Sequence, residues 1–412
     1  MQINSQRLQQ HFEAMSLIGK IGETGTCRPT LTALEKEAFA LAASWMHAAG
    51  MQTHIDHFGN LIGQLKGKDE SLPVLMLGSH LDSQPYGGRF DGVAGVLCAI
   101  EALTTLHENN ILPNRSIEII SFADEEGWRF NKGLFGSRGI LGKLEKDELL
   151  RTDKDGISRQ QALIDFGCNI QKFSESEYGP GSIFCFIELH IEQGPVLDIA
   201  NEAVGVVSGI SGPLWLTVKL KGMAGHAGSV PMALRKDAMV GAAQIVVALH
   251  QITNQIPGAP TVGTVGTMQV FPASRNIIPE EVSFTVDLRD IDIERRNKYE
   301  QQLRTQIDQI ATRHQLTYTI TEDTNSEPRY CANWIKEIIH QQCIEVNGHA
   351  APELMSGPFH DAMALSYACD YGMIFIRSKD GISHNPLEYS SYQDLAIGTQ
   401  ILLGTILEIL KK

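Results

Sequence analysis

The chain has 412 residues, of which 43% are hydrophobic and 20% are charged. This is ordinary globular composition, with enough length for two domains. Lysine and arginine total 34 against 48 aspartate and glutamate, so the formal net charge is −14. Such an acidic surface repels nucleic acid and anionic membranes, and we expect neither as a partner.

The seven cysteines indicate a reducing compartment. Their number is odd, no C-x-x-C pair occurs, and several lie in apolar runs, as Cys98 does in Val-Leu-Cys-Ala-Ile at 96–100. Buried free thiols explain this pattern best. The N-terminus has no apolar core of a secretory signal, and no apolar run approaches the length of a membrane span. We therefore expect a cytoplasmic protein.

The first half of the chain alternates strand-like and helix-like patterns. Strands are predicted at 74–77, 116–122 and 183–189. Between the first two, residues 93–106 have the apolar spacing of a helix. This alternation predicts an α/β sheet covered on both faces, in which ligands collect at the carboxyl ends of the strands.

The middle of the chain has a different rhythm. Strands are predicted at 214–220, 261–270, 281–289 and 316–320, and helices at 232–255 and 293–313. The resulting β-α-β-β-α-β order is that of a ferredoxin-like unit, whose two helices cover one face of the sheet. We therefore predict an inserted α+β domain over residues 212–324.

The last part of the chain returns to the first pattern. It predicts a helix at 331–346, a strand at 373–377 and a closing helix at 394–410. The fold class is therefore α/β. A mixed-sheet α/β/α catalytic domain would consist of residues 1–211 and 325–412, with the ferredoxin-like lid and dimerisation domain inserted between them.

Histidines and acidic residues lie at the ends of the predicted strands. An unpaired buried carboxylate is costly, and metal ions compensate for several acids beside a histidine. The candidate ligands are His80, Asp91, Glu126, His190 and His384. They form no compact motif. Each alone also fits a purely structural role, since Asp91 before Gly92, for example, fits a turn residue or a helix cap. Their joint placement at the ends of one predicted sheet favours metal binding.

Asp91 is the acidic residue suited to bridge two cations at roughly 3.5–4 Å, the spacing of two-metal hydrolytic sites. His80 and His190 would complete one metal site, and Glu126 and His384 the other. Asp82, two residues after His80, is placed to accept the second ring N–H of that histidine.

Glu125 would then be free of the metals. Adjacent residues on extended backbone point in opposite directions, so Glu125 and Glu126 need not bind the same ions. A free carboxylate beside the metals is suited to take a proton from water and deliver it to a leaving nitrogen.

These residues resemble the M20 family of two-metal amidohydrolases and peptidases, over nearly the whole chain. The motifs at 78–83, 87–92, 124–127, 188–194 and 377–386 are similar to its carbamoylase branch. That branch contains N-carbamoyl-L-amino acid hydrolases, β-ureidopropionases and allantoate amidohydrolases. In peptidase relatives the ligand that corresponds to His190 is usually a carboxylate.

The resemblance also implies substrate-binding residues. Arg289 and Asn276 would bind the substrate carboxylate, since an arginine matches a carboxylate with two hydrogen bonds. His226 would stabilise the oxyanion of the tetrahedral intermediate, and Gln193 would contact the ureido group. Apart from the resemblance, Arg289 equally fits a surface charge at a strand end, and His226 a helix-entry residue.

One segment departs from the branch. Gly357, a predicted substrate-binding position, is followed by Pro358 and Phe359, where relatives usually have small residues. The larger and stiffer pair would reshape the substrate pocket. The side-chain preference therefore does not follow from the resemblance.

The resemblance implies hydrolysis of an N-carbamoyl-L-amino acid to the amino acid, carbon dioxide and ammonia, with Glu125 as the base. Allantoate amidohydrolase is the nearest alternative. A dipeptidase or aminoacylase is disfavoured by His190, and a third alternative is a metal-binding structural protein that has lost activity.

Two divalent metal ions per subunit are expected, zinc first, with manganese, cobalt or nickel as other choices for such ligands. The inserted domain implies hinge closure over a small ureido acid substrate. We also expect a homodimer formed edge to edge through the inserted domains. In that dimer, His226 would be a candidate to serve the partner's site.

Overall fold

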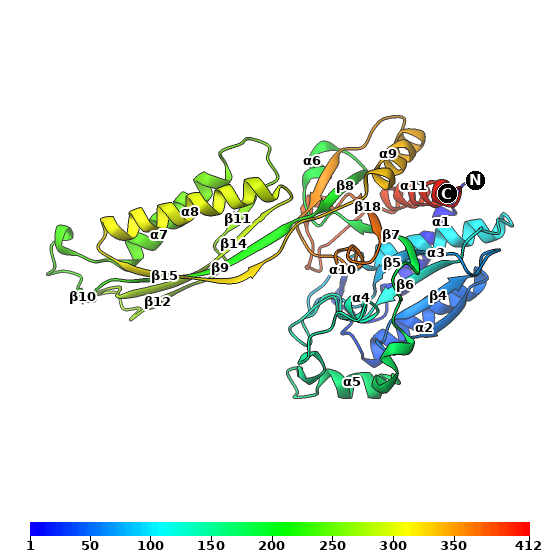
Figure 1. Cartoon of the computed structure of the whole chain (residues 1–412), viewed down its shortest axis with the longest axis horizontal. Coiled ribbons are helices and arrows are strands. Elements are labelled where there is room, and N and C mark those ends of the chain that lie inside the picture. Colours follow the sequence, from blue (N-terminus) through cyan, green and yellow to red (C-terminus); the bar gives the residue numbers. More distant parts are fainter. The chain divides into compact units, whose positions relative to one another are not determined.

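The computed structural model describes residues 1–412, which divide into two compact units (Figure 1). The large unit contains residues 1–208, 331–354 and 359–412. The small unit contains residues 209–330 and 355–358, and the segment predicted as an inserted domain, 212–324, lies within it.

The large unit is built on a mixed sheet with the strand order β8-β18-β7-β5-β6-β4-β3. Its four parallel strands are β18 (Asp370–Ile376), β7 (Ile183–Ile191), β5 (Val74–His80) and β6 (Ile117–Phe122). Antiparallel strands flank them: β8 (Val204–Ile210) on one side, and β4 (Leu61–Leu65) and β3 (Gln52–Ile55) on the other. The parallel strands are almost entirely buried, as expected for strands covered on both faces.

Helices pack on this sheet and complete the α/β fold that the sequence predicts. α3 contacts β5 and β7, α9 and α11 contact β18, α2 contacts β3 and β4, α10 contacts β7 and β18, and α4 contacts β6. The helices of this unit are α1 (Ser5–Met15), α2 (Ala33–Ala48), α3 (Val93–Glu108), α4 (Phe135–Gly139), α5 (Arg159–Phe166), α6 (Val196–Ala200), α9 (Asn333–Asn347), α10 (Asp361–Leu365) and α11 (Tyr392–Ile409).

Short elements join these larger ones. They are β1 (Lys20–Ile21), β2 (Gly25–Thr26), the 3-10 turns η1 (Glu148–Leu150), η2 (Ile170–Glu175) and η4 (Lys379–Gly381), and β17 (Glu353–Ser356), which leads into the small unit. Across both units, none of the helices combines the length and the apolar character that are needed to cross a lipid bilayer.

The small unit has an antiparallel sheet with the order β11-β14-β9-β15, and β12 also pairs with β14. Its main elements are β9 (Gly212–Lys221), α7 (Ala238–Thr253), β11 (Val262–Thr264), β12 (Met268–Phe271), β14 (Glu281–Asp290), α8 (Ile293–Arg313) and β15 (Thr317–Asn325). The short ones are β10 (Gly225–His226), η3 (Met232–Leu234), β13 (Ile277–Ile278) and β16 (Arg329–Tyr330). Alternate apolar residues of β9 and β14 are buried with apolar residues of α7 and α8, which gives the predicted β-α-β-β-α-β unit.

Two boundaries in this unit differ from the prediction. The helix predicted to begin at residue 232 begins at Ala238, because Asp237 caps it by accepting the N–H groups of Met239 and Val240. The single strand predicted at 261–270 is divided into β11 and β12. Gly266 lies between the two pieces, in line with the tendency of glycine to weaken a strand.

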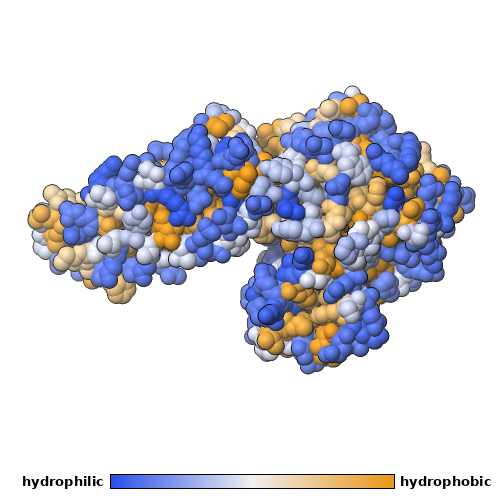
Figure 2. Space-filling model, in the orientation of Figure 1, coloured by the Kyte–Doolittle hydropathy of each residue, from blue (hydrophilic) through white to orange (hydrophobic).

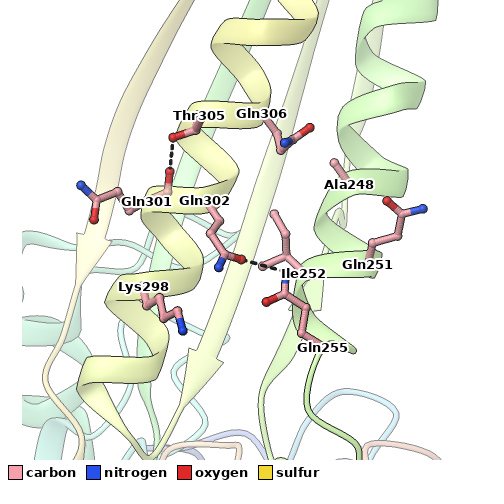
Figure 3. A pocket seen from close by; sticks show the side chains of 9 residues that line it. All are labelled: Ala248, Gln251, Ile252, Gln255, Lys298, Gln301, Gln302, Thr305 and Gln306. Carbon is pink, nitrogen blue, oxygen red and sulfur yellow. Dashed lines mark hydrogen bonds between the residues drawn. The ribbon is translucent and has the colours of Figure 1, made fainter.

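The surface of the small unit is polar around its two helices and apolar at the end that carries β10. A groove of about 520 Å³ between α7 and α8 is lined mainly by glutamines (Figure 3), and the surface around it is mostly hydrophilic (Figure 2). Apolar side chains lie instead at the end that carries β10, where Met223, Met232 and Leu234 are each at least 65% exposed.

Candidate metal centre and active site

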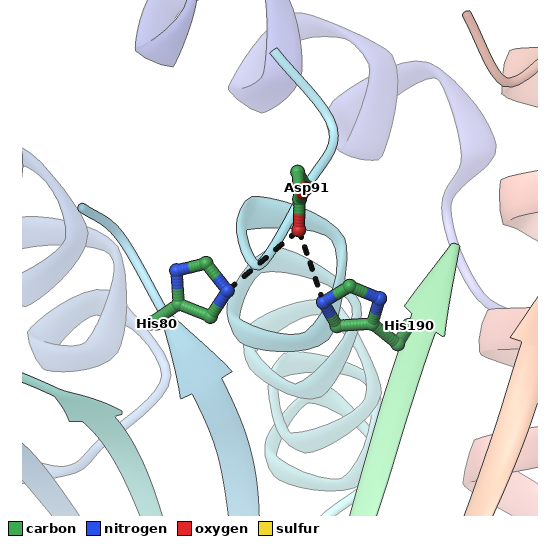
Figure 4. Close-up of side chains that lie close together, drawn as sticks. All are labelled: His80, Asp91 and His190. Atoms are coloured by element: carbon green, nitrogen blue, oxygen red, sulfur yellow. Dashed lines mark ion pairs between the residues drawn. The ribbon is translucent and has the colours of Figure 1, made fainter. Parts of the chain in front are cut away.

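The carboxyl ends of β5 and β7 bring two histidines of the large unit to Asp91, which lies just before α3 (Figure 4). Nε2 of His190 lies 3.2 Å from Oδ1 of Asp91, and Nε2 of His80 lies 3.7 Å from the same oxygen. All three side chains are buried. Two imidazole nitrogens and one carboxylate oxygen therefore face a common point.

A second group of donors shares Asp91. Nε2 of His384 lies 3.2 Å from Oδ2 of Asp91 and 3.7 Å from Oε2 of Glu126. Within each group the donor atoms lie within 4.8 Å of one another, close enough to hold one ion. The structure therefore places all five candidate ligands together, with one oxygen of Asp91 in each group.

The two buried histidines are oriented with Nε2 toward this centre. Nδ1 of His190 lies 2.9 Å from the carbonyl oxygen of Ile191. Nδ1 of His80 lies 3.0 Å from the carbonyl oxygen of Asp82 and 3.4 Å from the carboxylate of the same residue. A ring that donates its Nδ1 proton to an oxygen carries its lone pair on Nε2, and this is the form that binds a metal.

Asp82 also holds the turn that follows β6. Its two carboxylate oxygens accept the N–H groups of Glu125 at 3.4 Å and Glu126 at 3.3 Å. From this turn the two glutamates reach different groups, since Oε2 of Glu125 lies 3.6 Å from Nε2 of His80 while Glu126 faces His384. Glu126 is further held by the main-chain and side-chain N–H groups of Gln84.

The electrostatics of the centre are dominated by buried acids. Burial raises the pKa of Glu126 to about 7, and the charge of Asp91 acts in the same direction. Burial also raises the pKa of Glu125 well above its usual range, against the opposing effect of His80. Burial acts to raise the pKa of Asp91 too, but the imidazole rings of His190 and His384 beside it outweigh this effect and hold that pKa well below its usual range. Divalent cations would compensate for these acids, so the residues present fit metal binding.

Gln193, the predicted contact of the ureido group, lies at this centre. Its side-chain N–H donates to Oδ2 of Asp91 at 2.8 Å, and its main-chain N–H donates to the hydroxyl of Ser378 at 3.1 Å. The backbone of Gln193 has a φ of 58°, in the left-handed region. The bond to Ser378 helps to hold that conformation and directs the amide to the shared carboxylate.

Glu388 is a residue of the centre that sequence reasoning missed. It is buried, and Oε1 accepts the N–H groups of Phe90 at 2.9 Å and Asp91 at 3.1 Å. Oε2 accepts the hydroxyl of Ser383 at 2.9 Å. Glu388 therefore ties the loop of Asp91 to the loop of His384. Its only signal in the sequence is a carboxylate four residues after His384, away from any strand end.

We expect the E388Q variant to bind metal about 10-fold to 100-fold more weakly, a typical effect of removing a group that orients a ligand. Competition of the metal-free protein with a chromogenic zinc chelator would measure the affinity. The D56N variant is the control, because Asp56 is a buried carboxylate that accepts the main-chain N–H groups of Phe58 and Asn60. Equal zinc affinities in E388Q and D56N would contradict this role of Glu388.

Two further residues, Glu188 and His360, lie behind His190 and were not predicted from the sequence as part of the site. The ring of His360 lies 4.4 Å from that of His190, and Glu188 accepts the hydroxyl of Ser79 at 2.7 Å and the N–H of Ala362 at 3.0 Å. Glu188, His190 and His360 lie close enough to hold an ion. However, Nε2 of His190 already faces Asp91, and both oxygens of Glu188 accept hydrogen bonds. We therefore interpret Glu188 and His360 as support for His190.

The other predicted substrate residues belong to the small unit. His226 lies on β10, and the N–H of the next residue, Ala227, donates to the carbonyl oxygen of Asn276 at 2.9 Å. Arg289 lies at the far end of β14, where it donates to the carboxylate of Asp287 and to the carbonyl oxygen of Gly357. The length of β14, roughly 30 Å, separates Arg289 from His226 and Asn276. The small unit therefore does not bring Asn276 and Arg289 together.

A mixed sheet whose parallel strands bring two donor groups together around one aspartate defines an α/β protein with a candidate metal centre. The sequence profile of Peptidase family M20/M25/M40 matches residues 76–408. The chain therefore belongs to this metal-dependent family, which confirms the family predicted from the sequence.

Curated relatives cover nearly the whole chain. It is 43% identical to an N-carbamoyl-L-amino-acid amidohydrolase of a Pseudomonas species, with 98% of each chain covered. It is 37% identical to the N-carbamoyl-L-amino acid amidohydrolase of Geobacillus stearothermophilus, with 99% of each covered. It is also 35% identical to an allantoate deiminase of Arabidopsis thaliana, with 93% of this chain and 80% of that protein covered.

The fold is also found among solved structures. A hydantoinase/carbamoylase family amidase from Burkholderia ambifaria superposes with a TM-score of 0.91 at 34% identity. The match covers 99% of this chain and 98% of that one. The α/β fold class predicted from the sequence is thus confirmed by both the strand order and this likeness.

Proposed function

We propose that this protein hydrolyses N-carbamoyl-L-amino acids to the free L-amino acid, carbon dioxide and ammonia. The proposal is carried by the two donor groups that share Asp91, with Glu125 beside them and outside both groups. Two relatives that span almost the full length of the chain are N-carbamoyl-L-amino acid amidohydrolases, which supports this substrate class.

We propose two divalent cations per chain. Asp91 would contribute to both sites, with His80 and His190 in one, and Glu126 and His384 in the other. Nitrogen and oxygen ligands of this kind suit zinc, and also manganese, cobalt or nickel. When bound, the cations would polarise the ureido carbonyl and lower the pKa of water.

Glu125 would move the proton during the reaction. It would take a proton from the attacking water and deliver it to the leaving nitrogen. The hydrogen bond from its main-chain N–H to Asp82 fixes the start of the side chain, and Asp82 in turn contacts His80. Asp82 therefore holds both the proposed base, Glu125, and a proposed metal ligand, His80.

The remaining predicted residues would recognise the substrate. We propose that Arg289 binds the substrate carboxylate through paired hydrogen bonds and that Gln193 contacts the ureido group. His226 would donate to the developing oxyanion, and Asn276 would assist in holding the carboxylate. Gly357, whose carbonyl oxygen accepts a bond from Arg289, would lie next to the substrate.

We further propose a homodimer formed through the small unit, in which His226 and Asn276 serve the partner's site. Along β14, these two residues are too far from Arg289 to contact the same small molecule in one chain. The outer strands β12 and β15 offer edges for pairing. A light-scattering mass near that of one chain, 45.3 kDa, would contradict the dimer.

We also propose a reducing, cytoplasmic setting. All seven cysteines are free and five of them are buried. Burial raises the pKa of these thiols, as it raises that of Cys98 to about 12. The thiols therefore stay protonated and unreactive at neutral pH.

Allantoate hydrolysis is the second candidate, because an allantoate deiminase is among the relatives. A substrate panel would decide between the two. The purified protein would be assayed for ammonia release with N-carbamoyl-L-amino acids, their D isomers, allantoate and dipeptides. Turnover of allantoate or dipeptides without turnover of the carbamoyl compounds would overturn the proposal.

Removal of metal is expected to abolish this activity. Both donor groups would then consist of acids and histidines without the cations that polarise the carbonyl. Activity and metal content would be measured before and after dialysis against a chelator, and again after addition of zinc, manganese, cobalt or nickel. Dialysis without chelator is the control. Full activity in protein that retains no metal would contradict the expectation.

A further inference from the structure

Arg159, the first residue of α5, is a fully buried arginine outside the proposed metal ligands. A buried guanidinium is costly unless it is paired and hydrogen-bonded. The groups that pair with Arg159 therefore indicate which parts of the fold depend on it.

Arg159 joins the turn after β6 to the loop that follows this turn. Nη2 donates to Oδ2 of Asp124 and to the carbonyl oxygen of Lys132, both at 2.8 Å. Nη1 donates to Oε2 of Glu148 at 2.6 Å, and Arg138 pairs with the same carboxylate. Arg138, Glu148, Arg159 and Asp124 thus form a continuous chain of charges.

Asp124 directly precedes Glu125 and has a φ of 56°. This left-handed conformation is uncommon for residues with a side chain, although aspartate adopts it more readily than most, and surrounding contacts favour it here. Oδ2 of Asp124 bonds to Arg159, and Oδ1 is buried without a hydrogen-bond partner. Arg159 is therefore the principal anchor of the Asp124 side chain.

The same turn is packed tightly on its other side. The carbonyl oxygens of Asp124 and Glu125 accept the N–H groups of Phe135 at 3.2 Å and Leu134 at 3.1 Å. A Cβ on Gly133 would lie 2.2 Å from the carbonyl oxygen of Glu125. Because Arg159 bonds to Asp124 and also to the loop that closes on this turn, its loss would free both.

We propose that Arg159 is a positioning residue for the reaction, which holds Asp124 in its left-handed conformation and so aims the carboxylate of Glu125. This inference rests on the proposed role of Glu125 as the base. Without Arg159, Asp124 becomes an unpaired buried acid and the turn relaxes toward an unstrained conformation. A misplacement of about 1 Å at a reacting group lowers the rate about 100-fold.

The test compares the variants R159M, D124N and D124N/R159M with a matched control, R115M. Arg115 is also buried in the large unit, donates to the carbonyl oxygen of Pro73 and lies over the ring of Phe184, but it precedes β6. We expect R159M to lose about 100-fold in kcat, with KM within about threefold of the wild type and metal content unchanged. R115M should keep kcat within about twofold of the wild-type value, even if its melting temperature falls as much as that of R159M.

The double variant tests whether Arg159 acts through Asp124. If it does, the kcat of D124N/R159M should lie within about twofold of the kcat of the slower single variant, because the two residues act as a unit. R159K, which keeps the charge, should recover part of the lost kcat. A folded, metal-loaded R159M with the kcat of R115M would overturn the inference. The inference would also be overturned if the fold losses of kcat in R159M and D124N multiply in the double variant.

D124N preserves the shape of the side chain and decides the question if R159M does not fold, since wild-type kcat in D124N would also reject the inference. The E125Q variant, assayed in parallel, separates two failures. If E125Q keeps its turnover, the proposed base is wrong. If E125Q is inactive while R159M matches R115M, only the role of Arg159 is wrong.

Discussion

The E125Q variant is expected to lose a factor of about 10² to 10⁴ in kcat, the range that general acid–base groups contribute. The amide has nearly the shape of the carboxylate but cannot take a proton from water. Glu125 belongs to neither donor group, and its main-chain bond to Asp82 does not depend on the side chain. Metal content should therefore equal that of the wild type, as measured by elemental analysis of the purified protein.

The E126Q variant is the matched control for this experiment. Glu126 differs from Glu125 by one position but contributes an oxygen to the group of Asp91 and His384. E126Q should therefore lose metal as well as activity. Near-normal turnover in E125Q, or a loss of metal in E125Q equal to that in E126Q, would refute the assignment of Glu125 as the base.

Mixing two inactive variants, E125Q and H226A, is expected to restore about a quarter of wild-type activity. If His226 serves the partner's site, a mixed dimer contains one site with an intact Glu125 and an intact His226. Random exchange makes half of the dimers mixed, and one of the two sites in each is active. The chains would be mixed after reversible dissociation or produced together, and kcat measured per chain.

The control is a mixture of E125Q with E126Q. Both changes lie in the large unit of their own chain, so every site in the mixed dimer keeps one defect. No activity should return. If the E125Q and H226A mixture stays as inactive as this control while mixed dimers are present, His226 serves its own chain and the proposed exchange is wrong.

The five candidate ligands could be chosen from the sequence because each of them lies near the end of an apolar run or in a motif of the family. Parallel strands deliver their carboxyl ends to one edge of the sheet, so strand ends that are distant in sequence, such as those at His80 and His190, meet in space. Sequence reasoning of this kind needs only the positions of the strands, not the details of the loops.

The residues that were missed lie where no such rule applies. Glu388 acts from a loop after the last strand, and its role depends on how that loop folds back on Phe90 and Asp91. Arg159 begins a short helix, and nothing in its local sequence indicates that it reaches Asp124. The separation of Asn276 from Arg289 likewise follows from the length and direction of β14, which motif matching does not consider.

The strand order of the large unit has a consequence for biosynthesis. β7 and β8 follow one another in the sequence, yet β18 lies between them in the sheet. The ribosome synthesises β7 and most of β8 before the small unit, and β18 and His384 emerge only near the end of translation. A nascent chain that stops before Asp370 has an unfilled place in its sheet and lacks His384, a member of one donor group. The centre can therefore be completed only after synthesis of the C-terminal segment, and we expect shorter nascent chains to be inactive.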